Sequence, residues 1–268
     1  MSIFDRIGFD AGTTRLEDAL DFAEENGFYY LDFNADTGPN HMETWSSERI
    51  AAARDRCETT GINIGLHTLS AVNVAELSPY VSRGVENYMR ASIDLANRLG
   101  CKWTVVHAGY HFTSDPETRL SAAIGRLGRI STYAADTGQR ILLENLNFEP
   151  KHAEVKYLAH TVEECSQIFD AIPSSKLGWA FTVNHANLVP EGVGGFLDAF
   201  GIERIGEVRL ADNTGDYEVH MIPGEGNIDF ASCLNRLESS GYRGHYSMAY
   251  GSPEEKITSR NYLTSLLN

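Results

Sequence analysis

The chain has 268 residues, of which 42% are hydrophobic and 22% charged, as expected of a globular protein with a sizeable core. Its 37 acidic and 22 basic residues give a net charge of −15, and the scattered basic residues argue against a nucleic-acid partner. The sequence contains no apolar run of about 18 residues, so no membrane span is predicted. The first residues contain no basic segment followed by an apolar one, so we expect a cytoplasmic protein.

Eight short apolar, β-rich segments recur along the chain, each followed by a polar loop and an amphipathic helix. They are Arg6–Phe9, Tyr29–Asn34, Ile62–His67, Trp103–His107, Ile141–Asn145, Gly178–Val183, Glu207–Ala211 and Tyr246–Tyr250. Two of the helices are predicted to end at Gly27 and Gly100. Two others should begin at Asp115-Pro116-Glu117 and Ser252-Pro253-Glu254, where a capping residue precedes a proline and an acid.

Eight alternations of strand and helix predict a parallel sheet closed into a single (β/α)8 TIM barrel that spans residues 1–268 as one domain. Right-handed crossovers place every loop that follows a strand at the same rim, where barrels of this kind carry their active sites. The longest of these loops are predicted at 68–83, 148–161 and 212–227. A homo-oligomer is compatible with the sequence.

Polar residues at the predicted strand ends are the candidates for the active site. In chain order they are His67, His107, Glu144, Asn145, His185, Arg209, Asp212, Glu218 and His220. A lone histidine at a strand end is more often structural, but Glu144 follows an apolar run and is costly to bury unless it is paired or ligated. Several such residues on one rim predict a functional site. Nearby aromatic residues could stack on a sugar ring or belong to the core, namely Trp45, Tyr110, Phe112 and Trp179.

These residues resemble the xylose-isomerase-like barrels, which include sugar and sugar-phosphate isomerases and epimerases, dehydratases, and the relatives of endonuclease IV. The most specific part is Val-Arg-Leu-Ala-Asp-Asn at 208–213, followed by His220 and by Pro-Gly-Glu-Gly-Asn-Ile-Asp-Phe at 223–230. Leu-Glu-Asn at 143–145 and His-Ala at 185–186 support it. The resemblance covers nearly the whole chain and implies the barrel fold.

The resemblance also implies a divalent metal, which family members hold with Glu, Asp, His and Glu from strands five to eight. The first ligand falls on Glu144, but the other three positions hold Thr182, Arg209 and Ala249. Threonine and alanine do not replace these ligands, and a guanidinium cannot coordinate a cation. We therefore predict no metal at this shared position, and a charge-assisted pair between Glu144 and Arg209 in its place.

Two further sets of metal ligands in the endonuclease branch correspond to residues present here: His67, His107 and Glu144, and His185, Glu218 and His220. Two histidines and one carboxylate with an open position could bind one zinc ion. In the isomerase branch similar histidines contact the sugar instead. The prediction is an enzyme without a cofactor, with one divalent metal such as zinc on His67, His107 and Glu144 as the alternative.

Ala249 removes the second base of the family's epimerases, so the resemblance favours reactions that need one base: isomerisation, dehydration or retro-aldol cleavage of a small polyhydroxylated carbonyl compound. Glu144 would be the base, with His107 or His185 as the acid. Arg209 would stabilise an oxyanion or bind a substrate carboxylate or phosphate. The predicted substrate contacts are His67, Asn145, Asp212 and His220.

Two other functions are compatible with the sequence. Loss of three shared ligands would suit a non-catalytic relative that binds a sugar-like ligand. An endonuclease IV-like nuclease is disfavoured by the acidic charge and the lost ligands. Three zinc ions per chain would favour the nuclease, and none would favour a cofactor-free enzyme or a binding protein.

Overall fold

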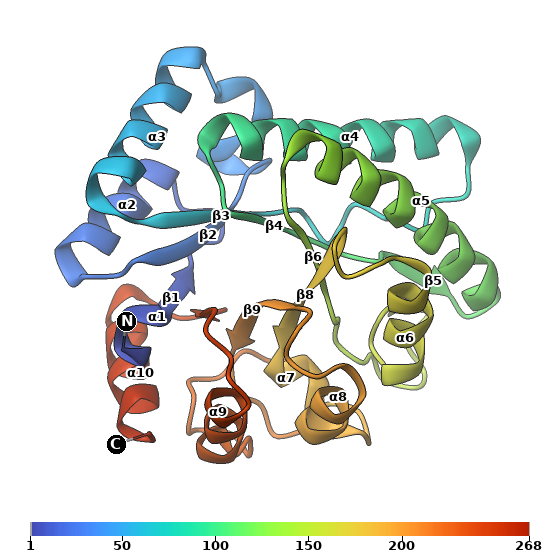
Figure 1. Ribbon diagram of the computed structural model, residues 1–268. Helices are drawn as coiled ribbons and strands as arrows, with labels where there is room; N and C mark the ends of the chain where they lie inside the picture. The colour runs from blue at the N-terminus through green and yellow to red at the C-terminus, as the bar shows by residue number, and fades with distance from the viewer. Residues whose placement is uncertain (1, 268) are drawn as a thin grey trace.

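Eight parallel strands form a closed barrel in the computed structural model, which describes residues 2–267 (Figure 1). Around the barrel they follow the order β1, β10, β9, β8, β6, β4, β3 and β2. Their bounds are β1 Ile7–Asp10, β2 Tyr30–Asn34, β3 Asn63–His67, β4 Trp103–Val106, β6 Ile141–Glu144, β8 Leu177–Thr182, β9 Ile205–Leu210 and β10 His245–Met248. Each predicted strand overlaps one of these, so the predicted (β/α)8 barrel is confirmed.

Helices surround the strands as an outer layer (Figure 1). The longer ones are α2 Leu16–Asn26, α3 Ser47–Thr60, α4 Pro79–Leu99, α5 Pro116–Thr137, α6 Val162–Ala171, α8 Gly192–Phe200, α9 Phe230–Ser239 and α10 Pro253–Ser265. The shorter ones are α1 Ile3–Arg6, α7 Val183–Ala186 and the 3₁₀ turns η1 Gly38–Asn40 and η2 Met42–Thr44. Among the described residues, no helix is both long and apolar enough to cross a bilayer.

The predicted helix ends are confirmed at the positions where the backbone needs glycine. Gly27 and Gly100 have φ angles of 64° and 76°, in the left-handed region, and their amides donate to carbonyls of the last turn. Ser252 caps α10 through a capping box with Glu255. Asp115 precedes α5 as predicted, but its carboxylate makes no capping bond and instead accepts from Arg119 Nε at 3.1 Å.

A small second sheet lies outside the barrel and was missed by the sequence reading. Strand β5, Tyr110–Phe112, pairs antiparallel with β7, Val155–Tyr157. The two segments lie far apart in the sequence, within loops that follow β4 and β6, so neither shows a hairpin pattern. The predicted loop at 148–161 therefore contains a strand, and the loop predicted to end at Arg83 already ends where α4 begins at Pro79.

The barrel interior is charged, whereas the outer faces of the strands are apolar. On β8, Trp179 stacks on Phe196 of α8 at 6.2 Å between ring centroids. On β9, Glu207 and Arg209 are two residues apart and so share one face of the strand, and Arg209 reaches Asp32 of the non-adjacent β2. These three side chains are at least 98% buried, directly below the rim.

Candidate active site

A cavity of about 390 Å³ opens at the rim where the C-terminal ends of the strands meet. It is lined by Asp10, His67, Ser70, His107, Glu144, Leu146, Asn147, Glu149, Tyr157, Thr182, His185, Arg209, Glu218, His220 and Ala249. The lining therefore includes most of the residues predicted for the site. It does not include Asn145 or Asp212.

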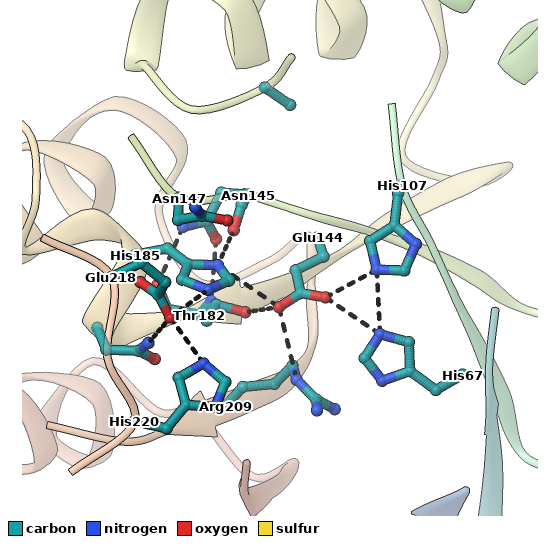
Figure 2. Close-up of polar contacts among 12 residues, drawn as sticks. His67, His107, Glu144, Asn145, Asn147, Thr182, His185, Arg209, Glu218 and His220 are labelled. Atoms are coloured by element: carbon teal, nitrogen blue, oxygen red, sulfur yellow. Dashed lines mark hydrogen bonds and ion pairs between the residues drawn. The ribbon is translucent and has the colours of Figure 1, made fainter. Parts of the chain in front are cut away.

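Glu144 lies at the centre of the polar contacts (Figure 2). Its Oε2 atom is 3.2 Å from the Nε2 atoms of both His67 and His107, which are themselves 3.1 Å apart. Its Oε1 atom accepts a hydrogen bond from Thr182 Oγ1 at 2.7 Å. Strands β3, β4 and β6 end beside one another, and this brings the three side chains together although they are distant in sequence.

The tautomer of His107 is fixed by Thr68. The Thr68 hydroxyl donates to the Val105 carbonyl at 2.9 Å, so it can only accept from His107 Nδ1–H at 3.4 Å. The Nε2 lone pair of His107 then points at Glu144 and His67. Three ligand atoms thus converge with separations of 3.1–3.2 Å, close to the spacing of about 3.3 Å expected for tetrahedral zinc ligands. The donor set fits a single divalent cation.

A second cluster lies on the opposite side of Glu144 (Figure 2). His185 Nδ1–H donates to the Asn145 carbonyl at 2.8 Å, which directs Nε2 towards Glu218 Oε1 at 3.3 Å. Glu218 also lies 2.7 Å from His220 Nε2. The predicted grouping of His185, Glu218 and His220 is thereby found in the structure.

Arg209, at the position where the resemblance implies a histidine ligand, lies beside Glu144. Its Nη1 donates to Asp32 at 2.5 Å and to Glu207 at 3.0 Å, and its Nη2 donates to Asp10 at 2.5 Å. Only Nε faces Glu144, at 3.7 Å from Oε1. The predicted ion pair between Glu144 and Arg209 is present within 4 Å, but it is the longest of the four contacts.

These contacts correct the prediction that Arg209 holds a substrate anion with its free donors. The guanidinium is 2% exposed, and both of its terminal nitrogens are bound to carboxylates. The partners Asp10, Asp32 and Glu207 were missed by the sequence reading. The available signal was an acidic residue inside or at the end of each apolar strand, where burial requires a cation nearby.

A metal does not fit at the shared position. Thr182 and Ala249 line the cavity there, and the Thr182 hydroxyl is already used as a donor to Glu144. The adjacent guanidinium of Arg209 carries a fixed positive charge and offers no lone pair. This part of the site therefore contains the guanidinium cation of Arg209 and lacks a set of metal ligands.

Two predicted substrate contacts are structural residues instead. The Asp212 carboxylate is fully buried and accepts from the backbone amides of Asn213, Gly224, Gly226 and Ile228. It therefore organises the loop after β9. Asn145 is also fully buried, and its side chain bonds Thr182 and Trp179. The aromatic residues Trp45, Tyr110, Phe112 and Trp179 lie outside the cavity lining, to which the missed Tyr157 contributes the aromatic ring.

Charges in the site shift several pKa values in opposite directions. Burial would raise the pKa of Glu144, but its contacts with His107 and His67 and the charge of Arg209 hold it well below its ordinary value. For His185, burial acts to lower the pKa, and the hydrogen bond and charge of Glu218 outweigh it, so the pKa is raised. The pKa of His107 is lowered, mainly by burial. Glu144 is thus ionised and His185 favours the protonated form.

The chain belongs to the family described as the xylose isomerase-like TIM barrel, whose model matches residues 20–265. The chain is also similar to individual proteins and to a solved structure. An uncharacterized protein of Methanocaldococcus jannaschii, MJ1311, is 29% identical over 236 residues, covering 86% of this chain and 78% of that protein. The fructoselysine 3-epimerase of Shigella flexneri is 24% identical over 160 residues, covering 59% of this chain and 55% of that protein. The crystal structure of a D-tagatose 3-epimerase-like protein superimposes with a TM-score of 0.86 at 25% identity, covering 98% of this chain and 97% of that one.

Proposed function

We propose that this protein is an enzyme of isomerase or lyase type that transfers a proton on a small polyhydroxylated carbonyl compound bound in the barrel-mouth cavity. The observation that carries the proposal is the pair formed by Glu144 and His185. Both line the same cavity, with His185 Nδ1 3.6 Å from Glu144 Oε1, and their surroundings shift their pKa values in opposite directions. Such a divergence supplies a base and an acid at one site. Sugar epimerases among the relatives support an activity of this class.

Glu144 acts as the base in this proposal and His185 as the acid. Glu144 is ionised, so it can accept a proton from a carbon next to the substrate carbonyl. Its lowered pKa also makes it a weak base, and the reaction therefore depends on polarisation of the carbonyl. His185 Nε2 can donate a proton or hydrogen bond to the carbonyl oxygen because Asn145 holds Nδ1. Isomerisation and dehydration begin with this transfer. In retro-aldol cleavage the base instead takes the proton of the β-hydroxyl group, the carbon–carbon bond breaks, and the enolate that is left takes up a proton at carbon.

Arg209 takes the place of the shared metal as a fixed positive charge behind the base. It acts at 3.7 Å on Glu144 and holds Asp10 at the edge of the cavity. A guanidinium preorganised by three carboxylates stabilises negative charge in the cavity without moving. We assign it a positioning and electrostatic role rather than direct contact with substrate.

Should the protein take up a divalent cation, His67, His107 and Glu144 would hold it. Bound there, the metal would supply Lewis-acid polarisation of a substrate oxygen. The residues around it would keep their roles in binding the substrate and in holding the acid at His185. The zinc content of the purified protein distinguishes the expectation of no cofactor from the alternative of one bound zinc ion.

Exchange of a substrate C–H in deuterium oxide tests the proposal, because it reports proton transfer whichever reaction follows. Purified protein would be incubated with ketoses, inososes and hydroxy-keto acids, with and without chelator, and followed by NMR. Exchange should fall at least about 100-fold in Glu144→Gln and His185→Asn. His152→Asn, at an exposed position of the loop after β6, is the matched control and should keep full activity.

Exchange unaffected by Glu144→Gln would contradict the assignment of the base. Binding of a sugar by calorimetry with no exchange in any compound would favour the non-catalytic ligand-binding function instead.

A further inference from the structure

The positive charges around the cavity already lie beside carboxylates of the protein. Among the described lining residues, Arg209 is the one guanidinium and there is no lysine. Its terminal nitrogens are bound to Asp10, Asp32 and Glu207. Lys256 lies outside the lining, with its ammonium 5.0 Å from the centre of the Phe9 ring.

The histidines that can carry charge are matched by carboxylates within the site. His67 Nδ1 lies 3.5 Å from carboxylate oxygens of both Asp10 and Asp32, and its Nε2 lies 3.2 Å from Glu144. His185 is paired in the same way with Glu218. Each of these cations therefore already has a carboxylate at hydrogen-bond or ion-pair distance, and a phosphate would have to compete with it.

One carboxylate on the outer wall of the cavity differs from the others because it has no cationic partner. Glu149 is half-buried and accepts from Asn147 Nδ2 at 2.7 Å, and no ion pair within 4 Å involves it among the described residues. Tyr157 lines the same cavity. A carboxylate and an aromatic ring in the lining of one cavity favour an alkylammonium group.

We infer, on the basis of the proposed function, that the substrate carries no phosphate or carboxylate and bears an amino group that pairs with Glu149. The cavity then takes an amino-substituted polyhydroxy carbonyl compound in preference to its neutral analogue. We expect the cavity not to bind a phosphorylated analogue, because its phosphate would face several carboxylates while the cations nearby are already paired with them. This replaces the expectation, drawn from the sequence, that Arg209 binds an anionic substrate group.

Calorimetric titration with two matched series of ketoses tests this inference. The first series is 1-amino-1-deoxy-D-fructose, D-fructose and D-fructose 1-phosphate, and the second carries the same three groups at carbon 6. Two positions of the substituent are tested because either end of the ketose could lie next to Glu149. In at least one series, the amine should bind about fivefold more tightly than the alcohol, and the phosphate should not bind measurably.

Glu149→Gln should remove the preference for the amine, so that the amine and D-fructose bind this variant within about twofold of one another. The matched control is Glu154→Gln, at an exposed position of the same loop outside the cavity lining, which should keep the preference. Thermal melting of both variants checks that they fold.

The outcomes separate this inference from the proposed function. Binding of a phosphate as tightly as the matching alcohol would overturn the inference alone, and so would an amine preference that survives in Glu149→Gln. Absence of binding and proton exchange for these five compounds, together with absence of exchange in the inososes and hydroxy-keto acids, would overturn the proposed function and with it the inference that rests on it.

Discussion

Replacement of Arg209 by methionine should destabilise the protein strongly, because it leaves buried carboxylates without their cation. Asp32 and Glu207 are fully buried, and the Asp10 side chain is 14% exposed; all three lie 2.5–3.0 Å from the guanidinium. Breaking a buried ion pair by removing one partner costs about 3–5 kcal/mol. At about 2 °C per kcal/mol for a chain of this size, the melting temperature should fall by about 6–10 °C. Arg209→Lys keeps the positive charge but not the planar fork of donors, so it should lose less stability than Arg209→Met.

The pH dependence of this loss follows from the direction of the pKa shift. Burial would raise the pKa of Asp10, but the charge of Arg209 and contacts with His67 outweigh it and lower the pKa. A carboxylate with a lowered folded-state pKa contributes stability above its unfolded pKa of about 3.9, and this stability disappears as the pH falls through the folded-state value. In Arg209→Met the same carboxylates take up protons more readily. The difference in the free energy of unfolding between Arg209→Met and the parent should therefore shrink as the pH falls from 7 to 4.

Urea unfolding and thermal melting of the parent, Arg209→Met and Arg209→Lys give the required free energies. Arg54→Met is the control, since Arg54 has a 48% exposed side chain in a surface pair with Glu58. Adding Asp32→Asn to Arg209→Met should recover part of the loss. A melting temperature for Arg209→Met within about 2 °C of the parent would show that these carboxylates do not depend on the guanidinium, and the role given to Arg209 would fail.

Three further predictions use other parts of the site. Any stoichiometric zinc taken up by the purified protein should be absent from His107→Ala and retained in His220→Ala; unchanged zinc in the first variant would place the ion elsewhere. Asp212→Ala should lose at least about 2 kcal/mol in urea unfolding, because four backbone amides lose their acceptor, and equal stability would refute its role in the loop. Burial and the charge of Asp32 raise the pKa of Glu207 to about 8, so its contribution is complete below the unfolded pKa and declines as the pH rises towards 8. Glu207→Gln should therefore gain stability relative to the parent between pH 5 and pH 8, and a constant difference across that range would contradict the raised pKa.

The sequence alone determined the barrel, because its signals are local and repeat along the chain. Each strand is a short apolar run, and each helix has an apolar face with a glycine or a capping residue at its end, as at Gly27, Gly100 and Ser252. Parallel strands with right-handed crossovers place His67, His107, Glu144 and His185 at one rim without knowledge of any contact. The positions of these four residues could therefore be predicted.

What the tertiary structure decided is which partner each polar residue takes. Arg209 pairs with Glu144 as expected, at 3.7 Å, but barrel closure brings it closer to Asp32, a residue 177 positions earlier in the chain. Asp212 occupies a strand end like the others, but it turns into its own loop and accepts four backbone amides there. A side chain at a strand end can face the cavity, the barrel interior or a loop. Local sequence does not distinguish these directions, because the competing hydrogen-bond donors and charges come from strands and loops that meet only after folding.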